Sequence, residues 1–200
     1  MDHSDFDPHH QQVDSKIIAS LERISQAFRV LLWTESKTHA LSPIQVQVLI
    51  FLLHHDAEKR NVSYLASEFN MTKATISDAV KALDKKGLIS KESTGRDTRS
   101  YRIDLSDKGK EVAGETAAFT RELRTPIGQL DADDKENLLL SLIGIIRHLN
   151  KAGIITPQRM CFTCSHYRPG PQGYSHFCQL MNQPLAPAEL RVDCPEHSPI

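Results

Sequence analysis

The sequence predicts a mainly α-helical protein with one small β-hairpin and a separate cysteine-rich tail. Three observations carry this prediction. Apolar residues recur at helical spacing over most of the first 150 positions, two short capped segments precede an alternating stretch, and every cysteine lies in the last forty positions. We therefore expect a polar N-terminal segment (residues 1–14), a helical unit (residues 15–153) and a tail (residues 154–200).

The composition is that of an ordinary globular protein, with 40% hydrophobic and 24% charged residues. The net charge is −1, so any basic surface has to be local. No apolar run approaches the roughly 18 residues of a membrane span, and the N-terminus lacks the features of a signal peptide. We expect a cytoplasmic protein with no membrane partner, where clustered cysteines are more often metal ligands or redox sites than structural disulfides.

Two helices are expected first, the earlier one amphipathic and about twenty-five residues long. The second begins with Ser42 as N-cap and Pro43 at the first helical position. It is apolar nearly all round, so we expect it to be buried. At its end we expect His54 and His55 to cap the helix, with a role in an effector crevice as the alternative. The apolar positions of the first helix are Ile17, Leu21, Ile24, Phe28, Leu31 and Leu32.

A helix-turn-helix is expected next. Ser63 can cap a short helix over residues 63–70, and Thr72 can cap a second helix that Gly87 ends. Two short helices with a tight joint are typical of this motif. The apolar stripe of the second helix is Ile76, Val80 and Leu83.

The segment "LISKESTGRDTRSYRIDLS" alternates polar and apolar residues on both sides of "TGRDTRS". This pattern predicts a two-stranded hairpin with a long, basic, glycine-containing tip. A hairpin that directly follows a helix-turn-helix is a wing.

Two further helices are expected before the tail. Residues 107–124 favour a long polar helix that breaks at residues 125–128, and a last helix runs from the N-cap Asp131 to Gly153. The first and last long helices are more apolar than a winged helix core requires. We expect these faces to pack between two copies of the chain, and packing within one subunit is the alternative. The face of the last helix is Leu138, Leu142, Ile145, Ile146 and Leu149.

Positive charge is concentrated between residues 72 and 102. Eight basic residues face four acidic ones there, a local balance of +4 in a chain of −1. Neutralisation of phosphates supplies most of the affinity of a DNA-binding module, so this balance indicates double-stranded DNA as partner. Small and hydroxylated residues at the start of the second helix allow it to enter a major groove. The basic residues are Lys73, Lys81, Lys85, Lys86, Lys91, Arg96, Arg99 and Arg102, and the acidic ones are Asp78, Asp84, Glu92 and Asp97.

With "LSPIQVQVLIFL", "NVSYLASEFNMTKATISDAVKALDKKGLISKE" and "GRDTRSYRIDLSDKG", residues 15–150 resemble the MarR-type winged helix-turn-helix regulators. The most specific part is "DTRSYRIDLSDKG", which is similar to the wing pattern of that family. The resemblance implies a homodimer formed by the terminal helices, with recognition helices in successive major grooves of a pseudo-palindrome.

Carried over by position, Thr72–Lys81 is the recognition segment, and Arg99 is the wing-tip residue that enters the minor groove, held by Asp97. Asp78 departs from the family pattern, because many relatives have a basic or neutral residue there; an acid can accept from cytosine but repels phosphate. The departure puts the operator sequence in doubt. The candidate DNA-binding residues are Thr72, Lys73, Ala74, Thr75, Ser77, Asp78, Lys81, Arg96, Asp97 and Arg99.

The tail has the spacing C-x2-C-x13-C-x15-C and too few apolar residues for a core of its own. Four thiolates can complete a tetrahedral zinc site that stabilises the tail, and the same four can hold an iron–sulfur cluster. We favour zinc over the cluster. A redox switch that joins Cys161 to Cys164 is a third option. The candidate ligands are Cys161, Cys164, Cys178 and Cys194, with His166, His176 or His197 as possible replacements for one of them.

These observations predict a dimeric, sequence-specific DNA-binding transcriptional regulator. We expect a repressor whose occupancy responds to a small-molecule effector or to the metal or redox state of the tail. The alternative is a metal-stapled protein-interaction module in which DNA binding is secondary. The sequence has no phosphate loop, no dinucleotide glycine pattern and no HExxH motif, so we do not expect an enzyme.

Overall fold

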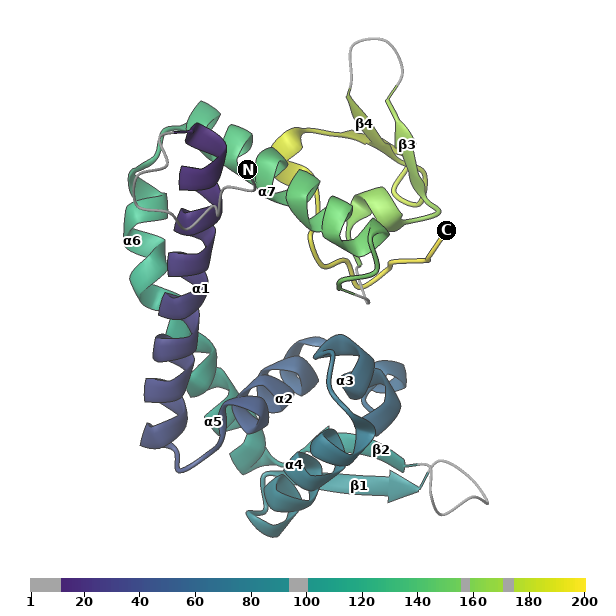
Figure 1. The fold of residues 1–200 in the computed structure, drawn as a ribbon. Helices are drawn as coiled ribbons and strands as arrows, with labels where there is room; N and C mark the ends of the chain where they lie inside the picture. Colours follow the sequence, from purple (N-terminus) through teal and green to yellow (C-terminus); the bar gives the residue numbers. More distant parts are fainter. Residues whose placement is uncertain (1–11, 94–100, 156–158, 171–174) are drawn as a thin grey trace.

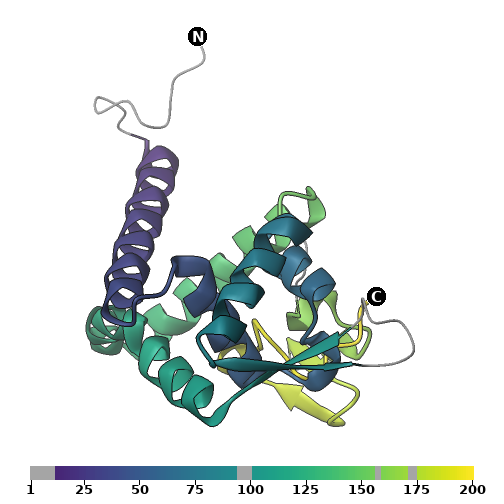
Figure 2. The same cartoon turned by 90° about the horizontal axis from the view of Figure 1, so that it is seen from below.

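The computed structural model describes residues 12–93, 101–155, 159–170 and 175–200. The chain is mainly helical, with two small antiparallel sheets, as the sequence predicts. Helix α1 (Val13–Thr38) stands beside α6 (Arg121–Gln129) as a column, with the winged helix at one end and the tail at the other (Figure 1). In both views α1 lies at the side of the molecule away from the wing (Figure 2).

Helix α2 (Pro43–His54) is the centre of the winged helix core. The Ser42 side chain accepts a hydrogen bond from the Gln45 backbone, and the Gln45 side chain accepts one from the Ser42 backbone, which together form a capping box. Val46, Val48 and Leu49 have no exposed surface, which confirms that this helix is buried. Its apolar side chains pack against α3 (Val62–Glu68), α4 (Lys73–Lys85), α5 (Asp107–Thr116) and the wing.

Helices α3 (Val62–Glu68) and α4 (Lys73–Lys85) form the predicted helix-turn-helix. The prediction that Ser63 caps α3 is wrong, because the Asn61 side chain accepts the capping hydrogen bond from the Tyr64 backbone at 2.9 Å. Thr72 caps α4 as expected, with its hydroxyl 3.1 Å from the Thr75 nitrogen. The predicted stripe of Ile76, Val80 and Leu83 has no exposed surface.

The wing consists of β1 (Ile89–Ser93) and β2 (Tyr101–Leu105), which pair antiparallel with Ile89 opposite Leu105. The predicted tip lies outside the described residues. The base of the wing is attached to the turn η1 (Ala57–Lys59) that precedes α3, since the Ile103 nitrogen donates to the Arg60 carbonyl at 2.8 Å.

The helix expected over residues 107–124 ends earlier than predicted. Helix α5 (Asp107–Thr116) passes into a 3₁₀ turn, η2 (Ala117–Thr120), and α6 then continues through Pro126. The predicted break at residues 125–128 is therefore wrong. A proline removes the hydrogen bond to the carbonyl four residues earlier, which here is in the first turn of α6, so the distortion falls next to η2.

Helix α7 (Ala132–Lys151) begins at the expected N-cap, since the Asp131 carboxylate accepts a hydrogen bond from the Asp134 nitrogen at 2.8 Å. Part of its apolar face packs on the tail of the same chain, with Ile143 fully buried. We expected this face to meet a second copy or the first helix, so the tail is a partner that the sequence did not indicate. Leu138 and Ile145 stay exposed.

The tail forms a three-stranded antiparallel sheet of β3 (Tyr167–Pro169), β4 (His176–Cys178) and β5 (Gln183–Leu185). Two 3₁₀ turns, η3 (Cys161–Thr163) and η4 (Pro187–Glu189), flank this sheet in the chain. Its buried apolar residues Met160, Leu185 and Leu190 pack on α7. Among the described residues, no helix has the length and apolar content that crossing a membrane requires.

Candidate DNA interface and thiol site

Helix α4 presents the predicted recognition residues on one solvent-facing side. Its opposite side carries the buried stripe, so the amphipathic pattern alone sets which residues point outward. Ser77 is half-buried at the edge of the row. The exposed members are Thr72, Lys73, Ala74, Thr75, Asp78 and Lys81.

Asp78, the acidic residue that departs from the family pattern, forms an ion pair with Lys81 on the same helix. The Lys81 ammonium lies 3.0 Å from the Asp78 carboxylate, and both side chains are largely exposed. An exposed pair of this kind stabilises a helix by roughly 0–1 kcal/mol, so little free energy is lost when either partner turns to another ligand. Asp78 therefore leaves the surface close to neutral at this turn of α4.

Two basic residues of the wing form ion pairs within the winged helix. Lys91 pairs with Asp84 of α4 at 2.8 Å, and Arg102 pairs with Asp104 and Glu92 on the two strands. The hydrogen bond that Arg102 donates to Asp104 and the negative charges of Asp104 and Glu92 raise the pKa of Arg102. The predicted contact residues Arg96, Asp97 and Arg99 lie outside the described residues.

The four cysteines, which come from three separate segments of the tail, line one cavity of about 110 Å³. Cys161 begins η3, Cys164 directly follows it, and Cys178 ends β4. Cys194 lies on the loop that follows η4, and its backbone nitrogen donates to the Arg159 carbonyl at 2.8 Å. The tail sheet and its two loops thus bring all four predicted ligands to the same place.

The Arg191 backbone holds Cys161, because its nitrogen lies 3.3 Å from the Cys161 sulfur. Burial raises the pKa of Cys161, and the three other thiols add to the shift while the Arg191 N–H opposes it. All four cysteines are free, so the Cys161–Cys164 disulfide is not formed here. An apolar cavity that holds four thiols favours their neutral form unless a cation compensates the thiolates.

The fit to a metal rests on donor type and on the shared cavity. Cysteine sulfur is the preferred ligand of zinc in structural sites and of iron in clusters. Within the described residues, no three His, Cys, Asp or Glu side chains are already placed to hold a metal ion. Metal binding would therefore require the thiols to move closer together around the cavity.

The three histidines of the tail differ in position. His166 lines the thiol cavity. His176 is hydrogen-bonded to the Tyr167 hydroxyl at 2.9 Å, and His197 to the Thr163 hydroxyl at 3.0 Å. Burial lowers the pKa of both His176 and His197. Of the three, His166 is therefore the one placed to replace a cysteine as ligand.

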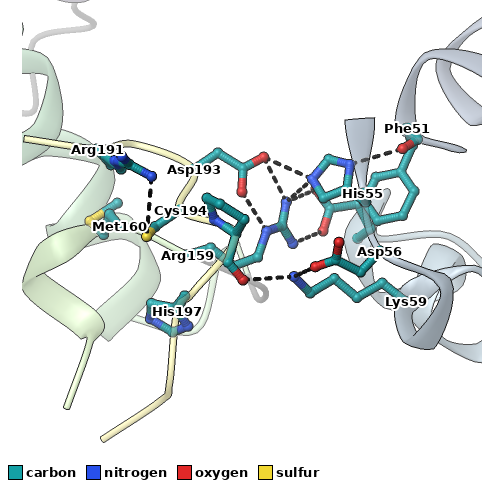
Figure 3. Close-up of polar contacts among 12 residues, drawn as sticks. Phe51, His55, Asp56, Lys59, Arg159, Met160, Arg191, Asp193, Cys194 and His197 are labelled. Carbon is teal, nitrogen blue, oxygen red and sulfur yellow. Dashed lines mark hydrogen bonds and ion pairs between the residues drawn. The ribbon is translucent and has the colours of Figure 1, made fainter. Parts of the chain in front are cut away.

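No pattern in the sequence predicts the buried arginine that joins the tail to the helix-turn-helix. Arg159 is 8% exposed, and its guanidinium contacts Asp193 of the tail at 2.5 Å (Figure 3). The same guanidinium contacts Glu68 of α3 at 2.7 Å. It also donates to the Tyr64 hydroxyl at 3.0 Å. Burial lowers the pKa of Arg159, but the hydrogen bonds of Asp193 and Glu68 outweigh it, and the net shift is upward. Only its position two residues before Cys161 could have drawn attention to it.

His55 completes this cluster at the end of α2. One ring nitrogen lies 2.9 Å from the Phe51 carbonyl, and the other lies 2.9 Å from the Asp193 carboxylate (Figure 3). The expected capping role of His55 is therefore present. The ring also stacks on Phe51 at 3.8 Å between centroids. We name Arg159, Asp193, Glu68, Tyr64 and His55 the Arg159 clamp.

A sequence model of the MarR family matches residues 39–100, which include α2, α3, α4 and β1. The fold is similar to that of S. aureus MepR in a complex with DNA (21% identity, TM-score 0.57, covering 66% of this chain and 96% of that chain). It is also similar to MepR in a DNA-binding conformation (20% identity, TM-score 0.58, covering 66% of this chain and 98% of that chain). A third similar structure is a MarR transcriptional regulator from Methanosarcina mazei Go1 (22% identity, TM-score 0.55, covering 68% of this chain and 96% of that chain).

At such identities the structural similarity establishes a shared fold. About a third of this chain lies outside each alignment. The part of the chain that a MarR family model matches is therefore the helix-turn-helix and the first strand of the wing. In its fold, the winged helix-turn-helix of this chain is similar to the MarR-type regulators.

Proposed function

We propose that this protein is a transcriptional regulator that binds double-stranded DNA as a homodimer and acts as a repressor. The observation that carries the proposal is the row of exposed small, hydroxylated and basic residues on α4, opposite a fully buried stripe. A helix with this surface can enter a major groove and reach both base edges and phosphates. The DNA complex of MepR, which has the same fold, supports this use of the fold.

DNA binding is expected to depend strongly on salt. The affinity for a duplex selected from a random pool should fall by about a thousandfold between 50 and 200 mM salt, because bound cations are released from the phosphates. Lys73→Gln should weaken binding and reduce the slope of log affinity against log salt by about one per chain. Fluorescence anisotropy of a labelled duplex measures both quantities.

Lys135→Gln is the matched control for this experiment. Lys135 lies in α7, at the other end of the molecule from α4 (Figure 1), so the affinity and slope should not change. If the purified protein binds no duplex at low salt, the regulator proposal is wrong. The protein-interaction module, with the tail as its docking surface, then becomes the better explanation.

The dimer is proposed from the exposed apolar residues of the long helices. Large apolar side chains along α1 face solvent in the single chain, and surfaces of this kind are usually covered by another protein. The combination Ile17→Asp and Ile24→Asp should convert the dimer to a monomer in sedimentation experiments, whereas Lys108→Asp on α5 should not. A wild-type monomer at micromolar concentration would contradict the proposal. The exposed residues of α1 are Val13, Ile17, Ile18, Ile24, Phe28, Val30 and Trp33.

For the tail we propose a metal site formed by Cys161, Cys164, Cys178 and Cys194, with zinc as the metal and an iron–sulfur cluster as the alternative. The shared cavity and the hydrogen bond from the Arg191 N–H to the Cys161 sulfur support it. A zinc ion would supply a closed coordination shell whose binding free energy stabilises the tail. The proposal includes no catalytic step, and a small-molecule effector remains part of it.

A further inference from the structure

We propose that the Arg159 clamp couples the thiol site to the helix-turn-helix, so that metal occupancy of the tail changes the affinity of α4 for DNA. This inference rests on the proposed function and deepens it by naming how the tail would regulate DNA binding. It concerns the tail of this chain, which lies largely on α7 and meets the winged helix at the clamp.

On the tail side, the clamp is built into the segments that carry two of the thiols. Arg159 precedes Cys161 by two positions, and Asp193 directly precedes Cys194. The backbones of these segments pair, since the Cys194 nitrogen donates to the Arg159 carbonyl and the Cys161 nitrogen donates to the Arg191 carbonyl at 3.1 Å. Any movement of Cys161 or Cys194 around the cavity is therefore passed to the Arg159–Asp193 pair.

On the DNA-binding side, the clamp holds the end of α3. Both guanidinium Nη atoms of Arg159 reach the Glu68 carboxylate, at 2.7 and 3.1 Å, in a bidentate pair. Glu68 is the last residue of α3, and the joint to α4 is tight, with the Met71 nitrogen 2.9 Å from the Ala66 carbonyl. A shift of Glu68 therefore displaces α3 and α4 together.

Among the residues that the structure describes, few polar contacts outside the clamp join the tail to the helix-turn-helix. A cavity of about 620 Å³ separates them, lined on one side by Lys59 and Tyr64 and on the other by Lys151, Phe162 and His197. Beside the clamp, the Lys59 ammonium donates to the Pro195 carbonyl at 3.4 Å (Figure 3). A contact centred on one ionic cluster around a buried arginine can be formed or broken as a unit, and a switch requires two such states.

Arg159 can act as such a switch because its charge is shared. The buried guanidinium is balanced by two carboxylates, one from each side, at 2.5 Å from Asp193 and 2.7 Å from Glu68. If the tail becomes less ordered, Asp193 moves away from Arg159. The Arg159 guanidinium is then no longer held in the orientation that pairs with Glu68. The ordered tail thus fixes α3, and a fixed α3 lowers the entropic cost of placing α4 in the groove.

The test measures DNA affinity of the full-length protein loaded with Zn(II) and after removal of the metal with a chelator. Removal should weaken binding by about fivefold or more in the wild type, as expected for a coupling between two sites. Glu68→Gln keeps the shape of the side chain and leaves the thiols untouched. In this variant the loaded and stripped proteins should bind DNA with the same affinity, although zinc is still bound.

Glu58→Gln is the matched control, because Glu58 is an exposed acid on η1, close to α3. The DNA affinity of this variant should keep its full dependence on zinc. Hydrogen exchange gives an independent measurement: zinc removal should accelerate exchange of the α3 amides in the wild type and in Glu58→Gln, but not in Glu68→Gln.

If the wild type binds both zinc and DNA but its DNA affinity does not respond to zinc, the coupling is overturned and the proposed function stands. A Glu68→Gln protein that keeps the full response also overturns the coupling. Failure to bind zinc overturns the proposed zinc site, and failure to bind DNA overturns the proposed regulator. Elemental analysis and anisotropy on the same samples distinguish these outcomes.

Discussion

Replacing Gly109 by alanine is expected to lower the free energy of unfolding by about 3 kcal/mol, the upper part of the range for overpacked sites. Gly109 lies in the first turn of α5, where a Cβ atom would stand 1.8 Å from the carbonyl oxygen of Leu88 and 2.9 Å from its carbonyl carbon. These atoms are backbone and cannot rotate away. The start of α5 and the start of the wing must therefore separate.

Separation is costly because the same place is densely hydrogen-bonded. The Ser106 side chain caps α5 through the Gly109 nitrogen at 3.0 Å and donates to the Gly87 carbonyl at 2.7 Å. The Ser106 nitrogen donates to the Leu88 carbonyl at 3.1 Å. Moving α5 outward would weaken these bonds together.

Gly114→Ala is the matched control on the same helix. No atom lies within 4 Å of a Cβ built at Gly114, so alanine should raise the free energy of unfolding by roughly 0.5–1 kcal/mol through better helix propensity. Urea unfolding followed by circular dichroism, at one protein concentration, measures both variants. Equal midpoints for the two variants would show that the contact at Leu88 relaxes without cost.

Local signals predicted most of the helices. Ser42 with Pro43, Thr72 and Asp131 each combine a capping side chain with the start of an apolar pattern, and all three are N-caps in the structure. The start of α3 was misplaced because Asn61 and Ser63 are both good caps two positions apart. The hydrogen bond from the Ile103 nitrogen to the Arg60 carbonyl holds the backbone just before Asn61 and so favours Asn61 over Ser63 as the N-cap. No local sequence pattern indicates this long-range contact.

The parts that could not be predicted depend on contacts between distant segments. The apolar face of α7 gave no information on whether the tail, another helix or another chain would cover it. Arg159 contacts Glu68 across 91 positions and Asp193 across 34. Nothing in the local sequence distinguishes it from the other two arginines of the proline-rich tail, Arg168 and Arg191. The cysteine spacing, by contrast, suggested a common site, and the structure brings the four thiols to one cavity. Their metal remains a prediction.

Replacing Cys161 and Cys164 together by serine is expected to abolish metal binding. Two ligands cannot hold zinc in a closed shell, and the binding free energy of a structural zinc is also folding free energy for the segment that carries it. The small cluster of Met160, Leu185 and Leu190 depends on α7 for its cover. We therefore expect the tail to be cut by protease at least about tenfold faster in this variant, with the winged helix unchanged.

His176→Gln is the control for the loss of metal, because His176 is bonded to Tyr167 rather than to the cavity, and full metal content should remain. His166→Gln separates two ligand sets: unchanged metal content supports four cysteines, and a loss supports His166 as a ligand. Elemental analysis of protein purified without oxygen should find about one zinc per chain in a colourless sample. Iron with sulfide in a brown sample would indicate a cluster instead. Wild-type protein without zinc or iron would contradict the metal site, and the four thiols would then have to act without a metal.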